Sequence, residues 1–326
     1  MTGSYTILNS TLINEFNGIV TNNAINVIIA IISVLSNVIL LGIFLGYRVF
    51  RGRYALLIQL CCGDLIYSIA IIYMGLESIC IYSKALKTFK LPMKNGAICV
   101  LDIGLQLKLI VTILWMGVER FVAITFPVFY RLRVDGKPLR YIAAYVSAII
   151  VIIVIGFGLL NASNRNHLMV PVCGRRATFG LLMGVFIYSL SIFCNIMSTV
   201  LNAIAYVKAR KLMRTNIRRE QQQLHTILCY LIISLFSTVL VSVPNTKSLF
   251  KLYVNEDRSA ISKSLEWMQT LNTGLTLFVS MLLNQELRQH VWRLLSKNRF
   301  TKSKTRQPFF IGRFSPVFTQ FAWYEL

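Results

Sequence analysis

Charged residues are scarce in this chain of 326 residues. Asp, Glu, Lys and Arg together make up 14% of the sequence, whereas roughly 25% is usual in a soluble domain. Hydrophobic residues reach 56%, above the usual share of roughly 45–50%. This balance excludes an ordinary soluble globular domain and indicates a membrane protein.

The sequence also lacks the motifs of common catalytic and metal centres. It has no glycine-rich phosphate loop, no His-Glu-x-x-His and no Cys-x-x-Cys pair. Its histidines, His167, His225 and His290, fall in different segments of the chain. We therefore expect no catalytic site, no metal and no cofactor, and we do not expect an enzyme.

Long apolar runs dominate what is present. Each is long enough for the roughly 20 residues that cross a bilayer as a helix. A helix is expected because lipid cannot satisfy the polar groups of an irregular backbone. The sequence thus predicts an all-α membrane protein, a seven-transmembrane helix bundle. The seven runs are approximately 24–46, 55–82, 99–125, 140–161, 178–207, 224–246 and 265–284.

The basic residues set the expected orientation. Of the 34 lysines and arginines, 21 lie in the C-terminal segment and in the loops on its side of the membrane, against 11 on the opposite side. The positive-inside rule therefore places the N-terminus outside and the C-terminus in the cytosol. The formal charge of +22 therefore lies largely beside the cytosolic membrane surface, where anionic lipids attract basic residues. No nucleic-acid-binding motif accompanies it, so a nucleic-acid partner is not expected.

A few ionisable residues interrupt the apolar runs, and each is a candidate functional residue because charge inside a bilayer costs about 2.5–3.5 kcal/mol. Asp64 lies well inside the second run, and Glu119 adjoins Arg120 at the inner end of the third. Asp102 precedes Arg120 by five helical turns, about 27 Å, so both lie on one helix face, with Gln106 one turn from Asp102. Such a helix suits a signal that is sensed outside and reported inside.

The end of the third run resembles the signature of rhodopsin-like G-protein-coupled receptors, which is Asp/Glu-Arg-Tyr followed by Ala-Ile, Pro and Tyr. The spacing matches throughout, with phenylalanine in place of the first tyrosine. The matching residues are Glu119, Arg120, Phe121, Ala123, Ile124, Pro127 and Tyr130. Weaker matches are Asn37, Leu60, Asp64 and the segment 284–288, which resembles the start of the family's short amphipathic eighth helix.

The resemblance covers about residues 24–298. It implies an extracellular N-terminus at 1–23, a seven-transmembrane receptor domain with an eighth helix at 24–298, and a basic cytoplasmic tail at 299–326.

Other family motifs are missing. The fourth run has no tryptophan at the usual place, and the fifth lacks the usual proline. The Cys-Trp-x-Pro motif of the sixth helix is replaced by a segment that reads Ser-Val-Pro244, and Asn-Pro-x-x-Tyr of the seventh by 276–280, Thr-Leu-Phe-Val-Ser. Such losses around an intact arginine motif are similar to those of divergent nematode serpentine chemoreceptors, particularly the Srsx-like group.

The resemblance implies a receptor that couples to a heterotrimeric G protein. Glu119 would restrain Arg120 at rest, and Arg120 and Tyr206 would help to form the G-protein pocket on activation. Pro127 and Tyr130 would shape the loop that contacts the G protein. Arrestin is a further expected partner of the tail, and the plasma membrane, including that of a sensory cilium, is the expected location.

The short N-terminus favours a small extracellular ligand bound within the helix bundle, with Asp102 and Gln106 as candidate contacts. An odorant-like molecule is our first expectation. A neuropeptide, or a biogenic amine held by Asp102, is the alternative. Asp102 has a second interpretation as a structural residue paired with water or an outer lysine.

The family also implies a disulfide between the third helix and the second outer loop. Cys99 and Cys173 are the candidates, with Cys80 as a rival partner for Cys173. Asn9, in an Asn-Ser-Thr sequon, is a candidate glycosylation site. Three further polar residues, Asn37, Asp64 and Asn272, are expected to form the intramembrane polar core.

A function of another class remains open at this point, an ion-coupled transporter or channel. It would use Asp64, Lys108 and Asp102 as an ion path. It does not account for the residues from Glu119 to Tyr130.

Overall fold

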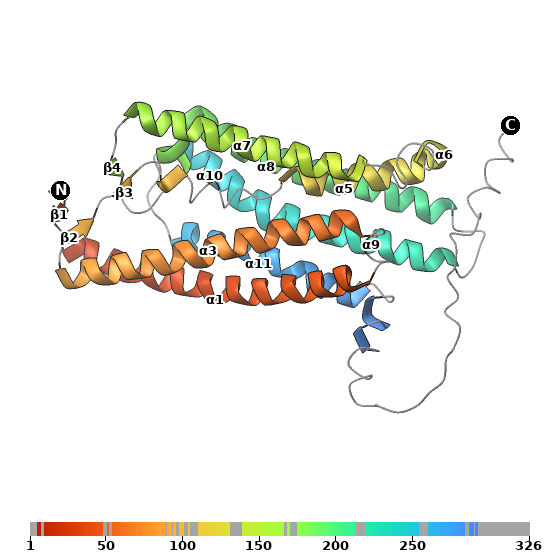
Figure 1. The fold of residues 1–326 in the computed structure, drawn as a ribbon, viewed down its shortest axis with the longest axis horizontal. Helices are drawn as coiled ribbons and strands as arrows, with labels where there is room; N and C mark the ends of the chain where they lie inside the picture. The colour runs from red at the N-terminus through yellow and green to blue at the C-terminus, as the bar shows by residue number, and fades with distance from the viewer. Residues whose placement is uncertain are drawn as a thin grey trace.

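Long helices lying side by side form the protein (Figure 1). The computed structural model describes residues 5–7, 10–47, 51, 54–88, 90–92, 94–95, 98–100, 104, 110–130, 139–165, 168–169, 175–212, 219–253, 260–283, 287–289 and 291–292. The main helices in these ranges are α1 (Ser10–Gly46), α3 (Ala55–Thr88), α5 (Ile110–Thr125), α7 (Leu139–Arg165), α8 (Arg175–Leu212), α9 (Arg219–Ser237), α10 (Val243–Tyr253) and α11 (Ala260–Leu283).

Four very short strands lie together at one end of the bundle. β1 (Tyr5–Ile7) pairs antiparallel with β2 (Lys90–Pro92), and β3 (Lys94–Asn95) pairs antiparallel with β4 (Leu168–Met169). The N-terminal segment and the loop before α8 are thereby both attached to the loop that follows α3. The described residues that follow α11, 287–289 and 291–292, lie near the opposite end (Figure 1). We call the strand end the outer end and the other the inner end.

The first helix is longer than the apolar run that predicted it. The run begins near residue 24, whereas α1 begins at Ser10. Ile19 and Val20 of this added part pack against Tyr82 and Ala85, which lie in the outer part of α3. Helix contact outside the apolar run therefore extends both helices.

The sixth helical rod is interrupted by a π-helical turn, η3 (Thr238–Ser242), between α9 and α10. Pro244 directly follows this junction and has no backbone N–H, so the usual bond to the carbonyl of residue 240 cannot form. The hydroxyl groups of Thr199 on α8 and Thr238 lie 2.6 Å apart, and Thr238 also donates to the backbone oxygen of Asn195. The proline thus explains the interruption, and the threonine pair fixes it against α8.

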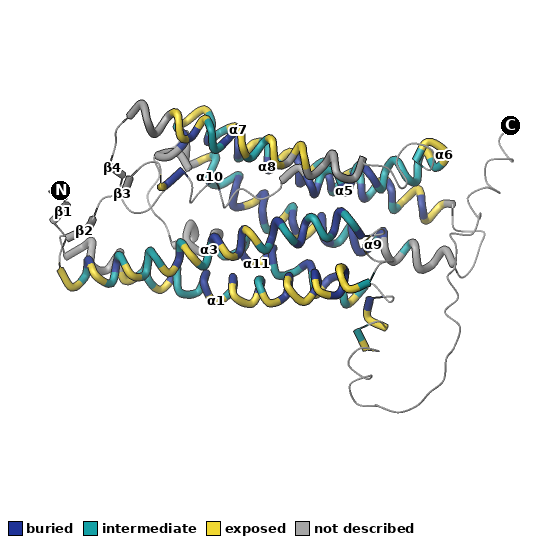
Figure 2. The backbone as a smooth tube through the Cα atoms, in the orientation of Figure 1, coloured by how far each residue is buried: buried dark blue, intermediate teal, exposed yellow. Residues whose placement is uncertain are grey.

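Exposed residues line the outer sides of the helices (yellow in Figure 2), and many of them are large hydrophobic residues. Ile152, Phe157 and Leu160 of α7 are more than half exposed, which lipid favours and water does not. By length and composition, four helical stretches of the described residues can cross a membrane, and Ala148–Leu160 is a shorter apolar stretch. The four are Asn17–Gly46, Ala55–Thr88, Phe179–Lys211 and Ile227–Phe250. The described part of the molecule is nearly all helical, and several of its helices are long and apolar enough to cross a bilayer.

Two glycines occupy positions where a side chain would clash with a neighbouring helix or strain the backbone. Gly117 of α5 lies against α8, where an added Cβ would be 3.0 Å from the carbonyl oxygen of Ser198 and 3.1 Å from its Cα. This close approach allows the hydroxyl of Ser198 to donate to the backbone oxygen of Ile113 at 2.7 Å. Gly180 has φ 80° at a kink near the start of α8, a conformation that side chains other than glycine strongly disfavour.

Candidate functional site

The acidic residue of the charged pair is held by a tyrosine from the following loop. Glu119 ends up only 8% exposed near the inner end of α5, and its Oε1 accepts a hydrogen bond of 2.7 Å from the hydroxyl of Tyr130. Pro127 begins α6 (Pro127–Phe129), a position where its missing N–H costs nothing. This single turn brings Tyr130 back to Glu119.

The basic residue of the pair faces a different helix. The Cζ atom of Arg120 lies 4.3 Å from the centroid of the Tyr230 ring, which belongs to α9. The Nε atom of Arg120 is buried and makes no hydrogen bond within the described part of the chain. Glu119, Tyr130 and Tyr54 also lie within electrostatic range of the guanidinium. The arginine is therefore half-buried beside aromatic rings, and its buried Nε is left without a hydrogen-bond partner in the described residues.

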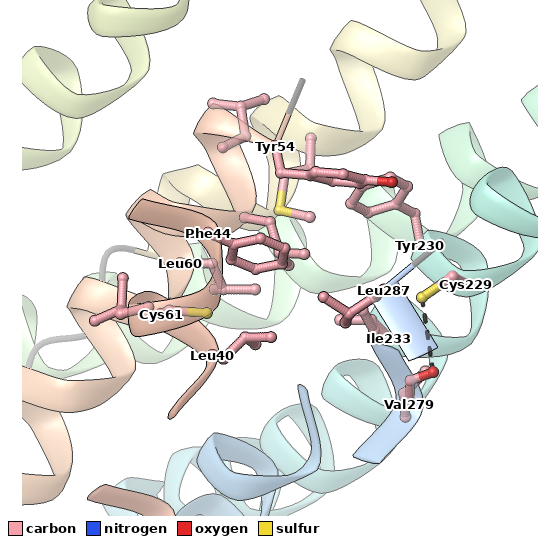
Figure 3. Close-up of a cluster of buried hydrophobic side chains, with 14 of the residues drawn as sticks. Leu40, Phe44, Tyr54, Leu60, Cys61, Cys229, Tyr230, Ile233, Val279 and Leu287 are labelled. Carbon is pink, nitrogen blue, oxygen red and sulfur yellow. Dashed lines mark hydrogen bonds between the residues drawn. The ribbon is translucent and has the colours of Figure 1, made fainter. Parts of the chain in front are cut away.

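A hydrophobic cluster at the inner end of the bundle contains Tyr54 and Tyr230, the two rings near this arginine that come from outside its own helix and loop (Figure 3). Phe44 of α1 stacks on Tyr54 with 5.3 Å between ring centroids, and Tyr230 belongs to the same cluster. Leu287, beyond α11, is 1% exposed and packs into it. Leu287 thus helps to close the inner end.

The remaining expected coupling residues surround this region. Phe121 is half-buried, and Nζ of Lys208 lies 5.8 Å from its ring centroid. Tyr206 is half-buried on α8, two residues before that lysine. Sequence reasoning identified Glu119, Arg120 and Tyr130 but missed Tyr54 and Tyr230, which no local motif connects to them.

Replacing Tyr130 with phenylalanine should lower the melting temperature of the purified protein by about 3–6 °C. The change removes one hydrogen bond to a buried carboxylate, worth about 1.5–3 kcal/mol. Phe129→Leu is the matched control because Phe129 is adjacent and 55% exposed. Thermal unfolding in the same detergent measures both variants, and equal melting temperatures would contradict the role given to the hydroxyl.

A buried polar cluster joins α1, α3 and α11. The Nδ2 of Asn37 donates to the backbone oxygens of Ser33 and Thr273, each at 2.9 Å. The hydroxyl of Ser33 donates to that of Thr273 at 2.7 Å, and the hydroxyl of Ser68 lies 2.9 Å from that of Ser33. Asp64 is 3% exposed, one turn before Ser68. The structure therefore places Asn37 in this cluster and Asp64 beside it.

Asn272 lies next to the cluster in sequence but contacts another helix. Its Oδ1 accepts a hydrogen bond of 3.0 Å from the hydroxyl of Ser237 on α9. Sequence reasoning missed Ser33, Ser68 and Ser237. The first two could have been found, because each lies four residues from a recognised polar residue on the same helix face.

Replacing Thr273 with valine should lower the melting temperature by a few degrees. Its hydroxyl accepts from Ser33 and donates to the backbone oxygen of Thr270, and buried groups left without a partner cost about 1–3 kcal/mol. Thr21→Val, which removes one exposed hydrogen bond to Asn17, is the control. A thermal-shift measurement that gives the same loss for both variants would argue against this cluster as a stabilising centre.

A second polar chain joins α8, α10 and α11 nearer the outer end. The Nδ2 of Asn245 donates to the hydroxyl of Ser191 at 2.8 Å, and its Oδ1 accepts from Nε2 of Gln269 at 2.9 Å. The hydroxyl of Ser242, one turn before Asn245, is buried without a hydrogen-bond partner in the described residues. Uncharged groups able both to donate and to accept hydrogen bonds are therefore concentrated beside the π-helical turn.

Several expected site residues lie outside the described residues. They are Asp102, Gln106, Cys173 and Asn9. Cys99 is buried and disulfide-bonded, whereas Cys80 is a free, exposed cysteine. The described residues contain no group of three or more His, Cys, Asp or Glu side chains that could hold a metal.

The sequence model of the family described as serpentine type 7TM GPCR chemoreceptor Srsx matches residues 30–295. The matched range contains both charged residues of the inner end and both polar clusters. No curated protein sequence matches the chain.

Proposed function

Because the chain belongs to the serpentine type 7TM GPCR chemoreceptor family Srsx, and is therefore a multi-pass membrane protein of a receptor family, we propose that it activates a heterotrimeric G protein. The signal in this proposal is a small, odorant-like extracellular ligand bound within the helix bundle. The observation that carries the proposal is Arg120, a half-buried cation at the inner end whose buried Nε lacks a hydrogen-bond partner among the described residues.

The proposed resting state has α9 closed against α5. Opening of α9 would free Arg120 for the C-terminal helix of the Gα subunit, with Tyr206 and Phe121 lining the same pocket. Pro127 and Tyr130 would fix the adjoining loop through Glu119. A ligand drives this change only by the difference in its affinity for the two states. The ligand therefore signals by raising the fraction of receptor molecules in the open state.

The ligand side of the proposal rests on residues in the outer half of the bundle. Asp102 and Gln106 remain proposed contacts. The chain through Asn245 adds uncharged hydrogen-bonding groups next to the interruption in the sixth helical rod. A ligand that binds there would act directly on the helix that must move.

The remaining expectations form part of the same proposal. The N-terminus lies outside the plasma membrane, with Asn9 glycosylated, and Cys173 is the partner of Cys99. The free state of Cys80 supports this pairing over its rival. An eighth helix follows α11 along the inner membrane surface, where buried Leu287 anchors it and exposed Trp292 contacts lipid. The basic tail from residue 299 binds anionic lipids and arrestin.

Ligand-dependent nucleotide exchange tests the proposed function. Cells that carry the chain and a promiscuous G-protein reporter are screened with small odorant-like molecules, and active compounds are retested with purified chain and G protein. We expect at least one compound to accelerate exchange only when the chain is present. Currents that persist when G proteins are inhibited, with no accelerated exchange, would instead indicate a transporter or channel.

A further inference from the structure

Arg120 and Tyr230 connect the two helices that must separate in the proposed function. Arg120 lies in the last third of α5, and Tyr230 lies in the middle of α9. The guanidinium carbon is 4.3 Å from the centroid of the ring, within the distance of a cation–π interaction. Opening of α9 would break this contact.

The surroundings make the contact strong. Tyr230 is 3% exposed, so water competes little for the guanidinium, and cation–π attraction increases when the pair is desolvated. Tyr54, which directly precedes α3, lies within electrostatic range of the same arginine and is itself stacked on Phe44. The carboxylate of Glu119 accepts a hydrogen bond from the hydroxyl of Tyr130, which lies in the turn after α5 and not on α9. The described partner of Arg120 on the moving helix is thus an aromatic ring.

We propose that Tyr230 is the positioning residue that keeps α9 closed on Arg120, through its ring rather than through its hydroxyl. The proposal rests on the proposed function, because it names what regulates the pocket on which that function depends. In this proposal, the contact made by Tyr230 determines what fraction of the unliganded receptor molecules is open. Removal of the aromatic face should raise the ratio of open to closed molecules about tenfold.

Two substitutions separate the ring from the rest of the side chain. Tyr230→Leu removes the aromatic face and keeps an apolar side chain, whereas Tyr230→Phe keeps the face and removes only the hydroxyl. If the leucine variant fails to fold, Tyr230→Met replaces it because methionine fills irregular space more readily. Size-exclusion chromatography establishes which variants are folded.

The first measurement needs neither ligand nor G protein. Spin labels are placed at two substituted positions, Leu45→Cys at the inner end of α1 and Leu224→Cys on α9, in a Cys80→Ser background because Cys80 is exposed and free. Pulsed electron resonance then reports the distance between α1 and α9. We expect the leucine variant to shift about tenfold more molecules to the longer distance, and the phenylalanine variant to remain within twofold of the parent.

The second measurement is ligand-free nucleotide exchange, which should rise in the leucine variant and not in the phenylalanine variant. Equal distance distributions for leucine and phenylalanine would overturn the proposal. A leucine-specific shift without exchange in any variant would uphold the latch and count against G-protein coupling instead. In an Arg120→Gln background, Tyr230→Leu should produce no further shift, and a further full shift would also overturn the proposal.

Discussion

Valine at position 117 should leave little folded receptor. The Cβ of any larger residue there would meet backbone atoms of Ser198 on α8 at 3.0 and 3.1 Å, and backbone cannot rotate away as a flexible side chain can. Overpacking of this kind costs about 1–3 kcal/mol, and the branched side chain adds further contacts. The gain in helix propensity over glycine, less than about 1 kcal/mol, is too small to offset it.

Gly42 provides the matched control for this prediction. It also lies inside a long helix, but an added Cβ would meet nothing within 4 Å. Gly42→Val should therefore fold like the parent chain, while Gly117→Val should lose most of its monodisperse fraction in fluorescence-detected size-exclusion chromatography. Similar yields for the two variants would show that α5 and α8 do not approach each other as closely as described.

Arg120→Ala should reduce ligand-dependent nucleotide exchange at least tenfold while ligand binding persists. The variant removes both the cation over Tyr230 and the group proposed to contact the Gα subunit. Such a receptor opens more readily but offers the G protein no arginine. Hydrogen bonds to a charged group are worth about 1.5–3 kcal/mol, which corresponds to roughly 10–150-fold in coupling.

Lys208→Ala is the control for the arginine variant. Lys208 is an exposed cation near Phe121, so its removal tests whether positive charge alone accounts for coupling. We expect it to retain exchange within twofold of the parent in a nucleotide-exchange assay with purified G protein. Full signalling by Arg120→Ala would refute the proposed mechanism. Equal losses of nucleotide exchange in both variants would indicate that the positive charge of the inner end, rather than Arg120 in particular, accounts for coupling.

The sequence predicted the helical bundle because apolar runs of bilayer length leave a backbone few alternatives. The family resemblance, read from Glu119 to Tyr130, agrees with the match to residues 30–295. The helix starts were less predictable. An apolar run marks the part of a helix that lipid covers, whereas α1 begins earlier, at Ser10, and Ile19 and Val20 in this added part pack against α3.

The composition of the candidate site was only partly predictable, for reasons of distance along the chain. Glu119 and Tyr130 are close in sequence and belong to one motif, so their proximity follows from a single turn. Arg120 and Tyr230 are separated by more than 100 residues, and no periodicity relates them. Pairs of this kind depend on how α5 and α9 pack, which a single sequence does not specify.

The added length of α1 has a consequence for the outer surface. A helix of 37 residues is about 55 Å long, whereas the hydrocarbon layer is about 30 Å thick. In the proposed orientation, the part of α1 before residue 24 rises about 20 Å above that layer and is braced by α3. If the ligand enters the bundle from this end, as the proposed function requires, α1 and α3 would form one side of the entrance. Diffusing ligands would then reach the bundle from the side of α7, α8 and α10.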